Sequence, residues 1–356
     1  MQSQSTKHVM DKRKCGEINT SVIGTGCWAF GGGDYWGEQS QSEVNAVVRR
    51  SVESGINYFD TAEIYNDGRS EQSLGKALDG VDRSTLLIGT KIAPSNTEPS
   101  TLIDHCEASL RRLKLECVDV YMIHWPIHPH SIRHFSDDER LIANPPSIES
   151  AFGVLQNLQS QGKIRQIGVS NFGVSQLSEA LAAGAKIAVN ELPYSLFERA
   201  IEAEILPFCR DHNIGIIGYM PLMQGILTGK YQSLEQIPPS RLRTRHFSGN
   251  RPGSRHGEKG AERLVMQALD AIRAVSASAG MSMAELAMAW CVANQDIACV
   301  VVGARHADQI EANVLALSRS LSQADKQKLD AITEPLLLQL GTSPDYYEGS
   351  QNGRTW

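Results

Sequence analysis

The sequence lacks any long apolar run. Among its 356 residues, the richest stretch is IACVVVGA at 297–304, well short of the ~20 residues that a membrane helix needs. The start, MQSQSTKHVMDKRK, has no apolar segment of the kind found in a secretory signal. Basic residues are also outnumbered, since 34 Lys and Arg against 40 Asp and Glu give a net charge of −6. We therefore expect no membrane partner and no nucleic-acid partner.

The cysteines are not spaced as in a disulfide framework. The seven cysteines are scattered, odd in number, and contain no CxxC pair. This pattern indicates reduced thiols in a cytoplasmic protein, and it favours neither a disulfide framework nor a zinc site. The overall composition, with 41% hydrophobic and 21% charged residues, is typical of a globular protein with a large core.

Eight short β-branched runs recur along the chain and predict eight strands. They occupy 21–26, 56–61, 86–91, 118–124, 164–171, 186–192, 214–221 and 297–304. Helical patterns lie between most of them, and the strands are apolar on both faces. This alternation predicts a parallel sheet closed into a (β/α)8 TIM barrel, with an open doubly wound sheet as the alternative.

Three segments depart from a minimal barrel. A Pro- and His-containing insertion follows strand 4 at 125–146, a long loop follows strand 7 at 223–260, and a tail occupies 334–356. Two extra helices are predicted before strand 8, at 261–279 and 283–294. We expect a single domain over 1–356, with its core at about 15–333.

Four chemically active side chains follow the carboxyl ends of strands 2, 3 and 4. Asp60 ends strand 2 and Tyr65 follows it in DTAEIY, while Lys91 and His124 end strands 3 and 4. Each has a structural explanation on its own, such as a helix cap, a solvated ammonium or a packed loop residue. Because strand ends of a barrel share one rim, we expect the four to converge into a catalytic group.

The chemistry of this group is that of a tuned proton donor. Tyrosine has a pKa near ~10, so it protonates an alkoxide inefficiently at neutral pH. An ammonium about 4 Å away, at an effective dielectric of ~20, stabilises the phenolate by up to ~4 kcal/mol, or roughly three pKa units. We expect Lys91 to lower the pKa of Tyr65, Asp60 to keep Lys91 charged, and His124 to bond the substrate carbonyl.

The sequence resembles the aldo-keto reductase superfamily. The resemblance rests on DTAEIYNDGRSEQSLGKAL, the Lys that ends strand 3, VDVYMIHWP, IGVSNF, YSLFER, YMPLMQGILTGKY and GARHADQIEANV, in family order from about residue 15 to about residue 333. It implies that Asp60, Tyr65, Lys91 and His124 form the family's catalytic tetrad. It also implies hydride transfer between NADPH and an aldehyde or ketone, or the reverse, with Tyr65 as general acid and base.

The resemblance also implies a cofactor laid across the rim. The matching cofactor positions are Cys27, Trp28, Asp60, Ser170, Asn171, Glu191, Tyr219, Pro221, Leu222, Gly225, Lys230, Arg241, Gly303, Arg305, Gln309 and Asn313. The substrate, a small carbonyl compound or alcohol, is expected against Trp28, Tyr65, His124 and Trp125. Trp36 is a further candidate for the wall, although ordinary rim packing explains Trp36 and Trp125 equally well, and Tyr219 has a core explanation too.

Two of these positions bear on which cofactor is preferred and on how its carboxamide is bound. Arg305 suits a 2′-phosphate, whereas NAD specificity favours an acidic residue on the ribose, so we expect NADPH with NADH possible. Position 312, often Glu in the family, is Ala here, with Asp308 and Glu311 nearby. Glu191 stands where the family usually has Gln, and a carboxylate accepts but does not donate a hydrogen bond, which is expected to weaken or reorient the contact with the carboxamide.

Other patterns are given less weight. GTGCWA at 24–29 mimics a dinucleotide fingerprint, but the helix that this motif requires does not follow. His124, His128, His130 and His134 lack a Cys or carboxylate at ligand spacing, so we expect no metal. The basic stretch 239–260 fits either a clamp for phosphates or an acidic substrate, or a solvated loop.

Two rival functions remain. Some superfamily members, the potassium-channel β subunits among them, bind cofactor and act mainly as partner subunits, although the intact tetrad favours turnover. A barrel lyase or isomerase that uses Lys91 as a Schiff base ranks last, because it leaves the matched cofactor positions unexplained. The loops after strands 1, 4 and 7 and the tail determine the substrate, and we expect the tail to fold toward the barrel mouth.

Overall fold

A computed structural model gives the structure of residues 10–356. The expectation that the chain starts without a secretory signal falls partly on residues 1–9, which lie outside the described part. Within residues 10–356 no single helix is long and apolar enough to span a membrane. Helices α9 (Glu262–Ala279) and α10 (Met283–Ala293) pass that test only as a pair, and the pair is bent by 91°.

Eight parallel strands close into a barrel in the order β10-β3-β4-β5-β6-β7-β8-β9. Because β10 pairs with both β3 and β9, the sheet has no edge, which excludes the open doubly wound alternative. The predicted (β/α)8 barrel is therefore confirmed. Its strands are β3 (Ile23–Gly26), β4 (Tyr58–Asp60), β5 (Leu87–Ile92), β6 (Val118–Ile123), β7 (Ile164–Ser170), β8 (Ile187–Pro193), β9 (Gly215–Tyr219) and β10 (Ile297–Gly303).

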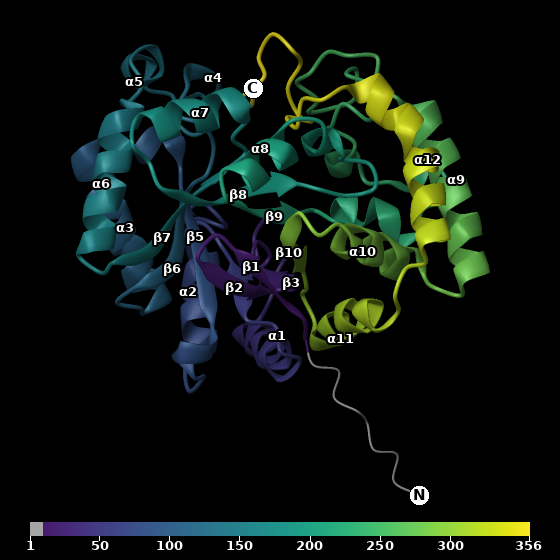
Figure 1. Cartoon of the computed structure of the whole chain (residues 1–356), viewed down its shortest axis with the longest axis horizontal. Coiled ribbons are helices and arrows are strands. Elements are labelled where there is room, and N and C mark those ends of the chain that lie inside the picture. The colour runs from purple at the N-terminus through teal and green to yellow at the C-terminus, as the bar shows by residue number, and fades with distance from the viewer. Residues whose placement is uncertain (1–9) are drawn as a thin grey trace, which may run out of the picture.

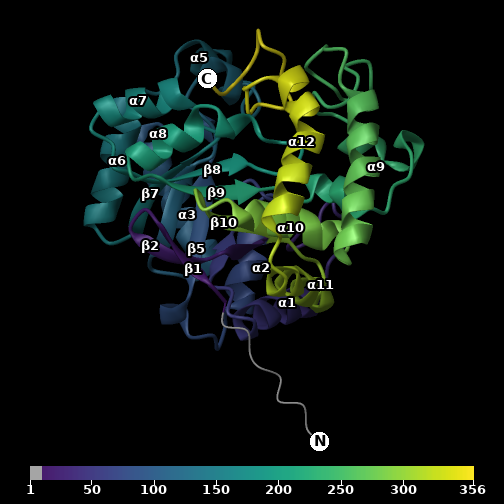
Figure 2. The same ribbon diagram turned by 45° about the vertical axis from the view of Figure 1, so that its right-hand side comes forward.

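Helices surround the barrel on all sides (Figures 1 and 2). The insertion after β6 contains two short helices, α4 (Pro129–Ile132) and α5 (Glu139–Ala143), and the loop after β9 contains only 3₁₀ turns. Each barrel strand is followed by a helix, and besides α9 and α10 these are α1 (Gln41–Glu53), α2 (Arg69–Ala77), α3 (Pro99–Leu113), α6 (Ile148–Ser160), α7 (Val174–Ala182), α8 (Ile205–Asp211) and, after the last strand, α11 (Ala307–Leu315).

A hairpin that the sequence analysis missed closes the amino-terminal end of the barrel. Strands β1 (Lys12–Cys15) and β2 (Ile18–Ser21) pair antiparallel, and Cys15 and Ile18 pack into the apolar cluster of the barrel interior. Gly215 permits this contact, because a Cβ there would lie 2.5 Å from the Cys15 sulfur. The signal was Gly16-Glu17, a two-residue turn whose glycine has φ +57°.

The predicted tail begins too early in the sequence. Residues 334–340 belong to α12 (Gln323–Leu340), which continues through Pro335. Leu329, Leu336 and Leu340 form a buried stripe at helical spacing, and this apolar face outweighs the helix-breaking tendency of one proline. The irregular tail therefore starts at residue 341.

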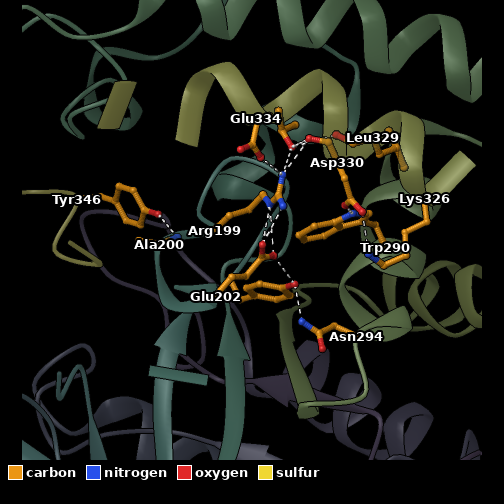
Figure 3. A network of polar contacts seen from close by, with 12 residues as sticks. Arg199, Ala200, Glu202, Trp290, Asn294, Lys326, Leu329, Asp330, Glu334 and Tyr346 are labelled. Carbon is orange, nitrogen blue, oxygen red and sulfur yellow. Dashed lines mark hydrogen bonds and ion pairs between the residues drawn. The ribbon is translucent and has the colours of Figure 1, made fainter. Parts of the chain in front are cut away.

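Polar contacts fix α12 to the barrel (Figure 3). Arg199, in the loop after β8, donates to Glu202 at 2.8 Å and to the Asp330 carbonyl at 3.0 Å. The indole of Trp290 donates to the Asp330 carboxylate at 2.7 Å. The backbone N–H of Ala200 donates to Tyr346 Oη of the tail at 3.1 Å. Helix and tail are thus held on the carboxyl side of the barrel strands.

Candidate active site

The four predicted catalytic side chains meet at the carboxyl rim. The Lys91 Nζ lies 2.5 Å from Asp60 Oδ1, 3.1 Å from the Thr61 carbonyl and 3.4 Å from Tyr65 Oη. Strand register explains the convergence, because Asp60 pairs with Gly89 on β5, two residues before Lys91. The imidazole of His124 packs edge-on against the Tyr65 ring at 5.6 Å between centroids.

Burial changes the acidity that the sequence predicts for Tyr65. Although Lys91 is as close as expected, burial outweighs it and, with Asp60 and Glu191 nearby, raises the pKa of Tyr65 above its ordinary value. The expectation of a lowered pKa was wrong, because it counted the ammonium and left out the desolvation of the phenolate and the two carboxylates. Tyr65 is a protonated phenol at neutral pH.

Lys91 is shared between two carboxyl groups. Its Nζ lies 3.3 Å from Glu191 Oε1 in addition to Asp60. Burial by itself disfavours the ammonium, but Asp60 and Glu191 overcome it and leave the pKa of Lys91 raised. Burial also raises the pKa of Glu191 well above its usual range, with the Asp60 charge as the second cause. The arrangement favours a charged Lys91 beside a neutral Glu191.

This chain has Glu191 where the family usually has Gln, and a neutral Glu191 changes what that difference implies for hydrogen bonding. A protonated carboxyl group has one O–H donor as well as an acceptor, as a glutamine amide has both. Its Oε2 is buried without a partner among residues 10–356. The expected weakening of the carboxamide contact assumed a carboxylate, and the environment of Glu191 favours the acid form instead.

His124 is neutral. Burial, followed by the charges of Lys91 and Arg354, lowers the pKa of His124 well below its usual value. Its Nδ1 is buried and has no partner in the described chain. A neutral imidazole at this place has one nitrogen that donates and one that accepts.

Predicted cofactor residues form one hydrogen-bonded group at the ends of β7 and β9. Asn171 Nδ2 donates to the His124 carbonyl at 3.1 Å and to Ser170 Oγ at 3.0 Å. Tyr219 Oη donates to Asn171 Oδ1 at 2.7 Å, and Ser170 Oγ donates to the Glu191 carbonyl at 3.0 Å. These contacts link predicted cofactor residues to His124.

The loop after β9 brings two cations to one glycine. Gly225 has φ +90°, and a Cβ there would lie 3.2 Å from both Arg241 Nη1 and Lys230 Nζ. Arg241 also donates to the Gln224 carbonyl at 2.6 Å. Pro221 is buried and Leu222 half-buried at the start of the loop. A bare backbone beside two cations is suited to a pyrophosphate.

The predicted adenosine end lies after β10. Gln309 Oε1 accepts from the amides of Arg305 at 2.7 Å and His306 at 3.3 Å, so it caps α11. Asn313 Nδ2 is buried without a partner in the described chain, whereas Gly303 is exposed. The Arg305 guanidinium donates to the carbonyls of Trp36 and Glu38, in the loop after β3.

Aromatic rings wall the mouth on two sides. Trp28 lies 5.8 Å from the Tyr65 ring, stacks on Tyr35 at 5.2 Å and meets Trp36 edge-on at 5.3 Å. Cys27, predicted as a cofactor contact, is fully buried and its thiol faces the Thr25 carbonyl. Tyr35 was not predicted, although YW at 35–36 repeats the aromatic signal of Trp28.

The tail forms the other wall, beside Trp125. The Arg354 guanidinium lies 3.7 Å from the centroid of the Trp125 ring and forms a buried ion pair with Asp345 at 2.7 Å. Thr355 Oγ1 donates to the Asn171 carbonyl at 2.7 Å. The tail therefore lies at the mouth, as expected. It also touches a predicted cofactor residue, Asn171, and no pattern in the sequence predicts this contact.

The histidine cluster and the basic stretch contact the tail and acidic residues. His130 bonds the Gly353 carbonyl at 3.1 Å, and His134 lies 3.4 Å from Glu348. Across residues 10–356 no group of three or more His, Cys, Asp or Glu side chains is placed to hold a metal. In the basic stretch, Arg245 and Arg251 pair with Glu258 and Glu262.

Comparisons with known proteins agree with this geometry. The model of the Aldo/keto reductase family matches residues 22–334. The NADH-specific methylglyoxal reductase of Escherichia coli (strain K12) is 30% identical over 339 residues, which cover 90% of this chain and 97% of the relative. A probable voltage-gated potassium channel subunit beta of Arabidopsis thaliana is 27% identical over 84% of this chain and 88% of the relative.

Solved structures show the same fold. The glycerol dehydrogenase from Gluconobacter oxydans superposes with a TM-score of 0.72 at 27% identity, covering 95% of this chain and 98% of that one. An aldo-keto reductase from Klebsiella pneumoniae in complex with NADPH has a TM-score of 0.67 at 23% identity, over 98% and 99% of the two chains.

The chain therefore belongs to the aldo/keto reductase family. The prediction of an oxidoreductase that uses a nicotinamide cofactor and acts on carbonyl compounds is confirmed.

Proposed function

We propose that this protein reduces an aldehyde or ketone with NADPH, and that Tyr65 gives the proton to the oxygen of the new alcohol. The observation that carries the proposal is the position of Lys91, fully buried and 3.4 Å from Tyr65 Oη. A buried ammonium held at a phenol has a clear role in proton transfer, because it stabilises the phenolate that the transfer leaves behind.

The cofactor fits the residues of the rim. Buried polar atoms without partners in the described chain, Glu191 Oε2, Arg305 Nε and Asn313 Nδ2, lie at the places predicted for its two ends. Gly225, with Lys230 and Arg241 beside it, offers space and positive charge for the phosphates between them. When bound, NADPH supplies the hydride.

The raised pKa of Tyr65 makes it a weaker acid but keeps its hydroxyl protonated at neutral pH, which is the form that reduction needs. The phenol holds its proton until a stronger base appears, and the alkoxide of a reduced carbonyl is such a base. Lys91 then faces a phenolate at 3.4 Å and compensates its charge. The reverse reaction needs Tyr65 to start as phenolate, so burial of the hydroxyl disfavours alcohol oxidation until the pH is high.

His124 orients the substrate in this proposal. Because its pKa is lowered by burial, it is an uncharged donor and does not compete with Tyr65 as the acid. Asn171, bonded to the His124 carbonyl, fixes the strand end on which the imidazole stands. His124 is thus placed to donate to the carbonyl oxygen while Tyr65 protonates it.

A panel of aldehydes, ketones and sugars tested with NADPH and with NADH examines the proposal directly. We expect carbonyl-dependent oxidation of NADPH, and we expect Lys91→Met to abolish it while leaving NADPH binding intact. Tight NADPH binding without turnover on any carbonyl would instead support the partner-subunit function. The NADH-specific relative from Escherichia coli makes NADH an informative second cofactor.

A further inference from the structure

The loop between β3 and α1, residues 27–40, holds the side chain of Arg305. Two guanidinium nitrogens of Arg305 donate to the carbonyls of Trp36 and Glu38. In return, Gln39 Nε2 donates to the Arg305 carbonyl at 2.9 Å. Three hydrogen bonds therefore connect this loop to the turn that follows β10, although the two are more than 260 residues apart in sequence.

Arg305 retains donors that nothing in the described chain uses. Its Nε is buried without a hydrogen-bond partner, and among residues 10–356 no carboxylate forms an ion pair with it, since its partners are neutral carbonyls. A guanidinium has five N–H donors in a fixed plane, and a phosphate accepts two of them side by side. The loop carbonyls thus fix the plane of the guanidinium and leave its Nε edge for an anion.

The same loop carries the aromatic wall of the substrate mouth. Trp28 packs on the catalytic Tyr65, and Tyr35 Oη donates to Gln224 Oε1 at 2.8 Å, across the mouth. The backbone between these rings contains glycines in the left-handed region, among them Gly31 at φ +77° and Gly37 at φ +75°. These glycines permit the tight turns that give the loop its present shape.

We propose that loop 27–40 is a positioning element for Arg305, and that a 2′-phosphate on the Nε edge of Arg305 stabilises the loop in the conformation that contacts Arg305. The proposal rests on the proposed function, because it takes the 2′-phosphate to be that of NADPH. Coupling of two sites is reciprocal. The loop therefore strengthens recognition of the 2′-phosphate, and the 2′-phosphate orders the wall that touches the substrate, which NADH does not do.

Hydrogen exchange of residues 31–39 tests this coupling without turnover. We expect saturating NADP⁺, and adenosine 2′,5′-bisphosphate alone, to slow exchange of this segment several-fold, and saturating NAD⁺ to leave it near the free rate. Gln39→Ala removes one contact of the loop with the Arg305 backbone, while the Arg305 side chain itself stays unmutated. It should weaken binding of adenosine 2′,5′-bisphosphate about three- to tenfold, as for one neutral hydrogen bond, with NAD⁺ binding unchanged.

Matched variants separate this role from a structural one. Arg305→Gln should abolish the NADP⁺-dependent protection, whereas Arg319→Gln, which also loses a bond to a backbone carbonyl, at Gly280, should retain it. With NADPH, the KM for the carbonyl should be lower than with NADH, and Arg305→Gln should remove the difference.

Two outcomes would overturn the inference while the proposed function stands. One is tight NADP⁺ binding with unchanged exchange of 31–39. The other is faster exchange, which would mean that the phosphate displaces the Trp36 and Glu38 carbonyls from Arg305. Absence of binding for both NADPH and NADH would overturn the proposed function itself, and the inference with it.

Discussion

At the amino-terminal end of the barrel, the buried Asp119 on β6 accepts from Arg165 at 2.9 Å, from the Ile88 amide at 2.8 Å and from Arg83. At the carboxyl rim, one fully buried ammonium, Lys91, serves two carboxyl groups. Asp119 thus has an excess of cations that reach toward solvent, with exposed fractions of 28% for Arg83 and 57% for Arg165. At this place the rim has one cation for two carboxyl groups, and the side chains of all three residues are buried.

The difference extends to the groups that have no partner. His124 Nδ1, Glu191 Oε2 and Arg305 Nε are all buried at the rim without hydrogen bonds in the described chain. The opposite end is closed by the β1–β2 hairpin, and Arg13 there donates to three carbonyls, those of Val292, Asn294 and Ile297. One end is built for stability, and the other holds polar groups ready for ligands at some cost in stability.

The largest expected effect is on turnover at the rim. Tyr65→Phe removes only a hydroxyl, and we expect the hydride-transfer step to fall by about 10²–10⁴-fold, as for loss of a general acid. The thermal midpoint and NADPH affinity should change little. A single-turnover measurement, a thermal scan and an NADPH titration on the same sample give these three quantities.

Tyr58→Phe is the matched control for that variant. Tyr58 is also fully buried in the barrel, and its hydroxyl has no hydrogen-bond partner in the described chain, the four predicted catalytic residues included. Its turnover should stay near that of the wild type. Near-normal hydride transfer in Tyr65→Phe would remove Tyr65 from the proposed mechanism.

A buried carboxyl group near the rim should also make the free energy of unfolding depend on pH. Burial raises the pKa of Glu198, in the loop after β8, to about 8, above the ordinary value of about 4.5 that it has in the unfolded chain. The folded state therefore keeps a proton that the unfolded state loses, so stability falls as the pH rises from about 4.5 through 8.

Glu198→Gln should flatten this pH dependence and stabilise the protein at pH above that window by a few kcal/mol, at about 1.4 kcal/mol per pKa unit. Urea unfolding at a series of pH values measures it. Glu204→Gln, an exposed position on the same segment, should leave the slope unchanged. A slope that persists in Glu198→Gln would assign the titration to another group.

At the opposite end, Asp119→Asn should lower stability without affecting chemistry. Removing one member of a buried ion pair typically costs about 3–5 kcal/mol, and the exposure of the two arginines reduces this to about 2–3 kcal/mol. Turnover per folded molecule should equal that of the wild type. A loss of turnover at constant stability would contradict the division of the barrel into a stabilising end and a reactive end.

The smallest effect is expected for Glu191→Gln. If Glu191 is the neutral acid that its raised pKa indicates, the amide preserves one donor and one acceptor, and turnover at neutral pH should stay within about tenfold, as for a single altered hydrogen bond. At high pH the wild type should lose activity through Glu191 ionisation, and the variant should not. Equal pH profiles of kcat/KM would contradict this prediction, because they would mean that Glu191 does not ionise in the range measured.

The sequence by itself determined the barrel and the location of its chemistry. Strand-length β-branched runs alternate with helical stripes, and both patterns are local, so they are readable without a structure. Because all strands are parallel, their carboxyl ends share a rim, which was enough to bring Asp60, Tyr65, Lys91 and His124 together. The family motifs then predicted cofactor positions along that rim.

Only the tertiary structure decided how these groups are protonated and what else surrounds them. The acidity of Tyr65 depends on burial and on every charge around it, and Glu191 comes from a strand 100 residues beyond Lys91. Contacts between distant segments also hold Arg305 against loop 27–40, the tail against Trp125, and Cys15 of the hairpin against Gly215. Periodicity is a property of neighbours in sequence, whereas desolvation and pairing are sums over neighbours in space, and those exist only once the chain has folded.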